Sequence, residues 1–173
     1  MACPSSQVML LTPCGRATQQ RFLEDIRKLM GCLMDNICLR TRKVGIGCKN
    51  GFFLYTWARI AELCKLPEWR IKQCAARVIE NGWVDSVQPR EKKTGADKRI
   101  EWTGLPSIKR VTLKYLKATG LEDAFKEAKA ASKKTTEARA KKLGVAVKYM
   151  LTPITLLAKY RRQRVAAGAS PPR

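Results

Sequence analysis

The sequence predicts a mainly α-helical protein with one small β wing, and three observations support this fold class. A long apolar stripe recurs at three- or four-residue steps between residues 18 and 43. Two shorter helical patterns follow, separated by the turn Lys65-Leu66-Pro67. A two-stranded pattern with a basic tip then spans residues 83–102. Helix, turn, helix and hairpin in this order are typical of a winged helix-turn-helix domain, here followed by basic C-terminal helices.

The first expected helix begins at Thr18 and runs to Lys43. Its apolar side chains form one stripe that should pack across the two later helices: Phe22, Ile26, Leu29, Leu33 and Ile37. Acidic residues lie in its early turns and basic residues at its end, as the helix dipole favours: Glu24 and Asp25, then Arg40, Arg42 and Lys43.

The helix-turn-helix follows a short, strand-like aromatic run at residues 52–56. Thr56 is placed to cap the second helix, whose expected inner face is Trp57, Ile60, Ala61 and Leu63. Pro67 prevents that helix from continuing, and a third helix is expected from Glu68 to Asn81, where Asn81-Gly82 ends it. The buried arc of this third helix should be Ile71, Cys74, Ala75, Val78 and Ile79.

The opposite arc of the third helix is polar. Arg70, Gln73 and Arg77 lie three and four residues apart, and Lys72 lies at their border. Arg can donate two hydrogen bonds to guanine, and Gln can pair with adenine. We therefore expect this arc to contact bases, although an ordinary solvated helix face shows the same pattern. Trp69, at the start of the helix, should either cover the turn or contact the sugar-phosphate backbone.

The hairpin is expected to hold a strand from Trp83 to Val87, a turn-rich tip over residues 89–98 and a returning strand over residues 99–102. Alternation along the returning strand places Ile100 and Trp102 on one face. The cations of this wing suit phosphates or the minor groove and would position the domain rather than read bases: Arg90, Lys92, Lys93, Lys98 and Arg99.

The C-terminal third is denser in positive charge, with 17 Lys and Arg against 4 Asp and Glu over residues 104–173. It should hold a short helix over 111–120, an exposed Ala- and Lys-rich helix over 121–143 and a last helix that begins at Pro153. We expect it either to dock a partner protein or, preferably, to make accessory phosphate contacts through Lys129, Lys133, Lys134, Lys141, Lys142, Arg161 and Arg162.

Four segments are therefore expected. An irregular lead covers residues 1–17 and a winged-helix DNA-binding domain covers residues 18–104. A basic helical extension covers residues 105–165, and a disordered tail covers residues 166–173.

Composition narrows the function classes. The net charge is +21 over 173 residues, which costs self-repulsion that phosphate would relieve. The chain has no histidine, which excludes Ser-His-Asp, Cys-His and His-ligated zinc catalysis, and it has no P-loop. We therefore expect a non-enzymatic protein with no catalytic residues, no cofactor and no metal.

Cysteine usage and apolar runs indicate the compartment. The seven cysteines are odd in number and none are spaced C-x2-C, and a cluster of Cys32, Cys38 and Cys48 fits no common metal site. No signal-peptide core and no 18-residue apolar run are present. We expect reduced thiols in a cytoplasmic protein that does not bind a membrane.

A family resemblance rests on two runs of the sequence. LYTWARIAELCKLPEWRIKQCAARVIENGWVDSV resembles the winged-helix core of the RepA-type replication initiators of IncFII-like plasmids. IKRVTLKYLKATGLEDAFKEAKAASKKTTEARAKKLG is similar to the strand, short helix and charged helix that follow it in that family. The resemblance covers roughly residues 20–165 and carries over the third helix, Trp69 to Arg77, and the hairpin. It implies binding to a plasmid origin, DNA opening and recruitment of host replication proteins.

The leading hypothesis is sequence-specific double-stranded DNA binding by a plasmid replication initiator. A winged-helix transcriptional repressor is the nearest alternative, and a basic protein that binds structured RNA is another. A magnesium-dependent nuclease is a third, which no carboxylate cluster encourages. The target sequence and the oligomeric state, a homodimer included, stay open.

Overall fold

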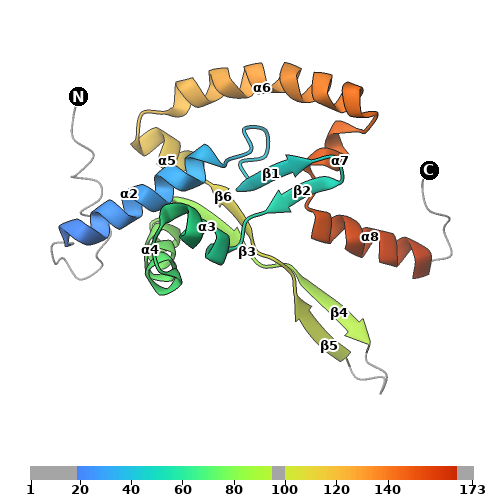
Figure 1. Cartoon of the computed structure of the whole chain (residues 1–173), viewed down its shortest axis with the longest axis horizontal. Helices are drawn as coiled ribbons and strands as arrows, with labels where there is room; N and C mark the ends of the chain where they lie inside the picture. The colour runs from blue at the N-terminus through green and yellow to red at the C-terminus, as the bar shows by residue number, and fades with distance from the viewer. Residues whose placement is uncertain (1–18, 95–99, 167–173) are drawn as a thin grey trace.

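The computed structural model describes residues 19–94 and 100–166 (Figure 1). The expected lead over residues 1–17 and the expected helix start at Thr18 lie outside the described residues, as does the tail from residue 167. The elements follow in this order: α2 (Gln20–Asp35), β1 (Gly45–Cys48), β2 (Gly51–Leu54), α3 (Trp57–Cys64), α4 (Glu68–Glu80), β3 (Val84–Val87), β4 (Arg90–Thr94), β5 (Ile100–Gly104), β6 (Ile108–Val111), α5 (Leu113–Ala118), α6 (Glu122–Leu143), α7 (Val147–Leu151) and α8 (Ile154–Ala166).

Helices α2, α3 and α4 pack together around one apolar core, so α2 crosses the other two as predicted. Each helix contributes side chains with no exposed surface, and burying one such side chain stabilises the fold by about 1.5–3 kcal/mol. These side chains are Leu29 and Leu33 of α2, Ile60 of α3, and Ile71, Cys74 and Val78 of α4. Two residues expected in this core, Leu63 and Ile79, are instead 39% and 38% exposed.

The helix-turn-helix forms from local signals. The Thr56 hydroxyl accepts a hydrogen bond from the backbone N–H of Arg59 at 3.1 Å, which confirms the predicted cap. Lys65 ends α3 in the left-handed conformation with φ +53°. Leu66 packs against the core, and Pro67 precedes α4. Gly82, at φ +69°, follows the C-terminal cap of α4, as the sequence predicted.

The predicted end of the first helix was wrong. Helix α2 ends at Asp35, and Arg40, Arg42 and Lys43 belong to the loop that follows rather than to a last helical turn. The cause is tertiary pairing with β6. The N–H of Val44 donates to the Lys109 carbonyl at 3.0 Å, and the N–H of Val111 donates to the Arg42 carbonyl at 3.2 Å.

The hairpin after α4 is longer than predicted and has two parts. At its base β3 pairs with β6 in antiparallel register, Val84 opposite Val111. Beyond a break at Gln88-Pro89, β4 pairs with β5 and protrudes from the body (Figure 1). Residues 90–94 were predicted as part of the turn. Their charged side chains favour strand weakly, and the register with β5 prevails over that preference.

A second hairpin, β1–β2, occupies the glycine-rich segment between the first expected helix and the aromatic run at residues 52–56. Gly45 has φ +148°, and a Cβ there would overlap the carbonyl group of Phe53. The N–H of Phe52 donates to the Thr152 carbonyl at 2.8 Å, which attaches this hairpin to the α7–α8 junction. The glycines therefore allow close packing instead of ending structure.

The C-terminal helices lie on the outside of the molecule: α6 runs along the top of the view in Figure 1, and α7 and α8 lie at its right. The strand and short helix implied by the family resemblance are present as β6 and α5. The expected boundary at residue 104 puts β6 in the extension, whereas β6 pairs with β3 and with residues 42–44 of the expected winged-helix segment. Helix α6 lies across the molecule from α4 (Figure 1) and buries only Phe125 and Ala140, as expected for an exposed helix. Helix α8 begins at Ile154, one residue after the predicted start at Pro153, which instead forms a β-bridge with Phe52. Among the described residues, no helix is both long and apolar enough to span a bilayer.

Candidate nucleic-acid interface

One face of α4 is polar and open to solvent. Five of its exposed residues are spaced so that they lie on one side of the helix, and exposed Glu68 and Ile79 lie at the edge of this face. The five are Trp69, Lys72, Gln73, Ala76 and Glu80. Trp69 is 60% exposed, so most of its side chain is open to solvent. Arg77 borders this stripe and is partly exposed. An exposed polar helix face of about three turns has the dimensions that fit a DNA major groove.

Within residues 19–94 and 100–166, the ion-pair partners of Lys72 and Arg77 are acids of α4 itself. Lys72 Nζ lies 2.9 Å from a Glu68 carboxylate oxygen, and Arg77 Nη1 lies 2.8 Å from a Glu80 oxygen. Exposed pairs of this kind are worth about 0–1 kcal/mol. A phosphate or a base edge can therefore replace either acid at little cost.

Arg70 has a different role from the one predicted. Its Nε lies 2.7 Å from an Asp25 carboxylate oxygen of α2, and its guanidinium lies 4.9 Å from the centre of the Phe22 ring. The Arg70 and Asp25 side chains are only 22% and 14% exposed. Arg70 Nη1 also donates to the Gln73 side chain at 3.3 Å. Arg70 therefore joins α4 to α2 and orients Gln73.

Replacing Arg70 with Ala is expected to lower the free energy of unfolding by about 1–3 kcal/mol, because Asp25 loses its partner in a mostly buried site. Urea denaturation of the two proteins measures the difference. The matched control is Lys72→Ala, which removes an exposed cation of the same helix and should change stability by less than about 0.5 kcal/mol. Equal effects of the two substitutions would contradict the structural role of Arg70.

The C-terminal end of α4 is fixed to the junction of β6 and α5. The Thr112 hydroxyl donates to the Gly82 carbonyl at 2.7 Å, and Lys114 Nζ donates to the Asn81 carbonyl at 2.7 Å. The rings of Trp83 and Tyr115 meet with their centres 5.4 Å apart. These contacts set the direction of α4 relative to the β3–β6 base of the hairpin.

The outer hairpin carries cations on one face and an internal ion pair on the other. Lys92 lies opposite Trp102 and Arg90 lies opposite Gly104, so these pairs share a face, and both cations are exposed. Glu91, on the other face, accepts hydrogen bonds at 3.0 and 2.8 Å from the Arg162 guanidinium of α8. Among the other predicted wing cations, Lys93 pairs through its backbone with Glu101, and Lys98 and Arg99 lie outside the described residues.

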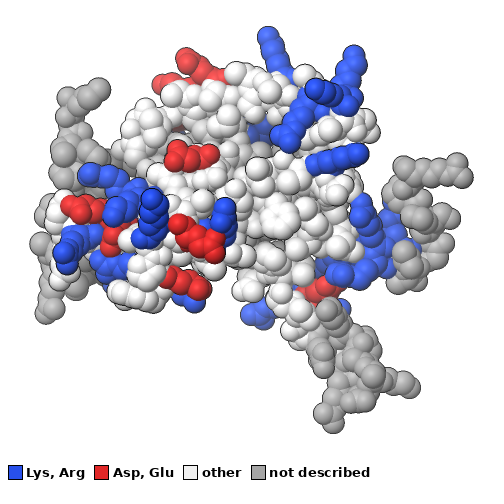
Figure 2. Space-filling view, in the orientation of Figure 1, with Lys and Arg blue, Asp and Glu red and all other residues white. Residues whose placement is uncertain are grey.

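The predicted accessory cations fall into two groups. Arg162 neutralises Glu91, and Arg161 donates to the Tyr149 hydroxyl, so both serve the packing of α8. Figure 2 shows blue side chains along the second half of α6. Lys126 pairs with Glu122 and Asp123, but five other exposed lysines of α6 make no ion pair within the described ranges. They are Lys129, Lys133, Lys134, Lys141 and Lys142. These lysines lie on the opposite side of the molecule from α4 (Figure 1).

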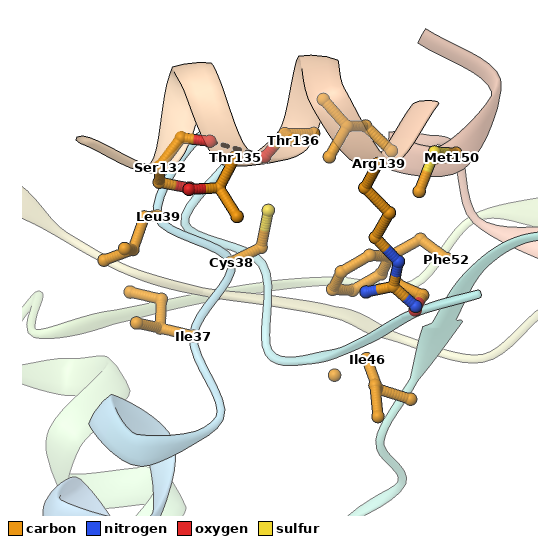
Figure 3. Close-up of a pocket in the computed structure, with 13 residues that line it drawn as sticks. Ile37, Cys38, Leu39, Ile46, Phe52, Ser132, Thr135, Thr136, Arg139 and Met150 are labelled. Atoms are coloured by element: carbon orange, nitrogen blue, oxygen red, sulfur yellow. Dashed lines mark hydrogen bonds between the residues drawn. The ribbon is translucent and has the colours of Figure 1, made fainter. Parts of the chain in front are cut away.

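A cleft of about 280 Å³ separates α6 from the β1–β2 hairpin (Figure 3). Its polar groups are engaged within the chain. The Thr136 hydroxyl donates to the Ser132 carbonyl at 2.7 Å, and Arg139 points across the cleft and donates to the Gly47 carbonyl at 3.3 Å. The cleft is thus a gap bridged by Arg139, and it does not adjoin the α4 surface.

Three ionisable side chains in the body of the protein have shifted pKa values. Lys109 Nζ donates to the Tyr55 carbonyl at 2.9 Å and to the Ser107 hydroxyl at 2.8 Å, and it lies 4.6 Å from the centre of the Trp57 ring. Burial lowers the pKa of Lys109 to about 8. Burial likewise raises the pKa of Cys64 to about 12 and of Cys74 to about 11. These thiols stay protonated at neutral pH, and a protonated thiol withdrawn from solvent behaves as a small apolar side chain.

Comparison of the chain with protein-family models, with curated proteins and with solved structures finds no match. The candidate site therefore rests on its own geometry and on the charge of the chain.

Proposed function

We propose that this protein binds duplex DNA as a winged-helix protein, with α4 in the major groove and the β4–β5 hairpin against neighbouring phosphates. The observation that carries the proposal is the exposed polar stripe of α4. This helix is held by Asp25 on α2 and by Thr112 and Lys114 after β6, so its free face is rigid. A rigid helix presents base-contacting side chains at low entropic cost.

The order of the elements supports the winged-helix assignment. Helix α2 leads to residues 42–44, which pair with β6, and α3, α4 and β3 follow. Strand β6 then lies between β3 and residue Lys43, to which Arg110 is bridged. Residues 42–44, β6 and β3 thus form a small sheet, and α2, α3 and α4 pack beside it. This arrangement places a recognition helix next to a wing. Figure 1 shows α4 and the protruding hairpin both in the lower half of the view, α4 at the left and the hairpin at the right.

The proposed roles differ among the predicted residues. Lys72, Gln73 and Arg77 contact base edges, while Trp69 packs against the sugar-phosphate backbone. Arg70 positions Gln73. The wing residues bind phosphates: Arg90, Lys92, Lys93, Lys98 and Arg99. Because the α6 lysines lie on the opposite side of the molecule, they would contact a second stretch of DNA or a partner protein.

The family resemblance supports a narrower proposal, that the DNA is a plasmid origin and that the protein initiates replication there with host proteins. A test plasmid that carries the DNA flanking the gene, with the protein supplied in trans, examines this role. Replication of that plasmid is expected. Repression of a reporter promoter without replication would favour the winged-helix repressor, and stronger competition by structured RNA than by duplex DNA would favour the RNA-binding alternative.

Two substitutions should separate base reading from phosphate binding. Arg77→Ala is expected to relax base preference by about 5- to 150-fold, the value of one good bidentate base contact of 1–3 kcal/mol. Lys92→Ala should weaken binding to all duplexes alike. Selection from a random duplex library, followed by titration of selected and scrambled sequences, measures both effects. Equal losses on selected and scrambled DNA for Arg77→Ala would remove Arg77 from the base-reading set.

A further inference from the structure

The protruding hairpin exposes two large apolar side chains. Trp102 is 65% exposed and Ile100 is 56% exposed, and both belong to β5. They alternate along the strand and therefore lie on the same face. Neither contributes to the apolar clusters of the body. Large exposed apolar side chains grouped on one projection mark a contact surface more often than a structural one.

The same face carries positive charge. Lys92 lies directly opposite Trp102, and Arg90 lies opposite Gly104, the next position of this face toward the body. Both cations are exposed and neither forms an ion pair within the described ranges. An exposed aromatic ring beside two free cations matches the chemistry of nucleic acid, in which bases alternate with phosphates.

The opposite face of the hairpin is already occupied. Glu91 is buried by its contact with α8, where Arg162 Nη2 lies 2.8 Å from the Glu91 carboxylate. Neighbouring strand residues point to opposite faces, so this contact directs Lys92 and Trp102 away from α8. Helix α8 thus acts as a support that turns the aromatic face outward.

We propose that Trp102, with Ile100 beside it, binds unstacked bases, so that the protein prefers DNA with a locally opened or kinked segment next to the site of α4. Apolar side chains on projecting elements can enter between base steps, and an aromatic ring can stack on a base that has left the helix. Lys92 and Arg90 hold the flanking phosphates. The inference rests on the proposed function, in which α4 binds the paired DNA next to the opened segment.

The test compares two short fluorescein-labelled DNA probes of the same sequence, one fully paired and one with a central run of mismatched bases. Fluorescence anisotropy at moderate salt gives the affinity of the full chain for each. The wild-type protein is expected to bind the mismatched probe about 5- to 150-fold more tightly, as stacking of one base on an aromatic ring implies. Trp102→Ala should bring this ratio close to one and change the affinity for paired DNA less than about threefold.

Two further variants sharpen the result. Trp102→Phe keeps a ring and should retain most of the preference. Tyr160→Ala removes a 51% exposed ring of α8 and should leave the ratio unchanged. Thermal unfolding should be the same for all three, since each side chain is exposed.

Three outcomes would overturn the inference. The first is equal binding of both probes by the wild-type protein. That result would reject the inference but not the proposal that the protein binds duplex DNA. The second is a Trp102→Ala protein that keeps the full preference. The third is a wild-type dimer that becomes monomeric on Trp102→Ala, measured by light scattering, which would make this face a protein contact. Failure to bind either probe would reject DNA binding itself and the inference with it.

Discussion

Raising the salt concentration from about 50 mM to about 200 mM is expected to weaken binding to duplex DNA by roughly 10³- to 10⁵-fold, the loss typical of six to ten phosphate contacts. The net charge of +21 and the exposed cations of α4, the wing and α6 supply that many contacts. Anisotropy titrations over a series of salt concentrations give the slope of log K against log salt. A slope near zero would show that phosphate neutralisation does not drive the association.

Single substitutions show how much each region of the surface contributes to this salt dependence. Lys92→Ala should reduce its magnitude by about one, because one phosphate contact is lost. Lys133→Ala on α6 is the informative partner, since Lys133 is equally exposed but lies across the molecule from α4. If α6 contacts a second stretch of DNA, Lys133→Ala lowers the slope only on duplexes long enough to reach it.

Lys109 is expected to make the stability of the protein rise with pH between about pH 8 and pH 10.5. In the unfolded chain this lysine keeps its proton up to its ordinary pKa of 10.5, whereas in the folded protein burial lowers the pKa to about 8. Between these values the unfolded state binds more protons, so raising the pH favours the folded state. The full window corresponds to at most about 3 kcal/mol, at 1.36 kcal/mol per pKa unit.

The effect of Lys109 is isolated by comparison with Lys109→Met, because the raised thiol pKa values of Cys64 and Cys74 act in the opposite direction above their ordinary pKa of 9.0. The difference in unfolding free energy between the wild-type and Lys109→Met proteins should grow in favour of the wild type from pH 8 to pH 10.5. Lys49→Met, which removes an exposed lysine of the β1–β2 turn, should show no such trend. A pH-independent difference for Lys109→Met would mean that Lys109 is solvated.

The parts of the fold that sequence reasoning predicted are those set by neighbouring residues. Thr56 caps α3, Pro67 separates α3 from α4, and Gly82 follows the end of α4. The length and exposure of α6 follow from its Ala- and Lys-rich composition. Each of these features needs only a local hydrogen bond, a backbone conformation or a helix propensity. Such signals can be identified from neighbouring residues in the sequence.

The features that were missed depend on contacts between distant segments. Helix α2 ends early because residues 42–44 pair with β6, and residues 90–94 are strand because β5 pairs with them. The β1–β2 hairpin contains three glycines that resemble a chain break when they are considered alone. Local propensity does not contain this information, since the pairing partner lies far along the chain.

The candidate site, like the fold, has features that the sequence predicted and features that depend on distant contacts. Exposure of Lys72 and Gln73 followed from the period of α4. The role of Arg70 did not, because its partner Asp25 lies 45 residues earlier, and Arg162 meets Glu91 across 71 residues. In the sequence, a cation that pairs with an acid on another element cannot be told from a cation that faces solvent. The exposed Trp102 was placed on its face correctly, but its pairing with Lys92 emerged only from the strand register.

The central claim is that α4 and the wing face the DNA, and acetylation of lysines with and without duplex DNA, read by mass spectrometry, tests it most directly. Lys72 and Lys92 should be acetylated much more slowly in the complex. Lys49, exposed in the β1–β2 turn, should react equally in both states. Unchanged acetylation of Lys72 in a saturated complex, with protection elsewhere on the surface, would contradict the placement of α4 in the groove.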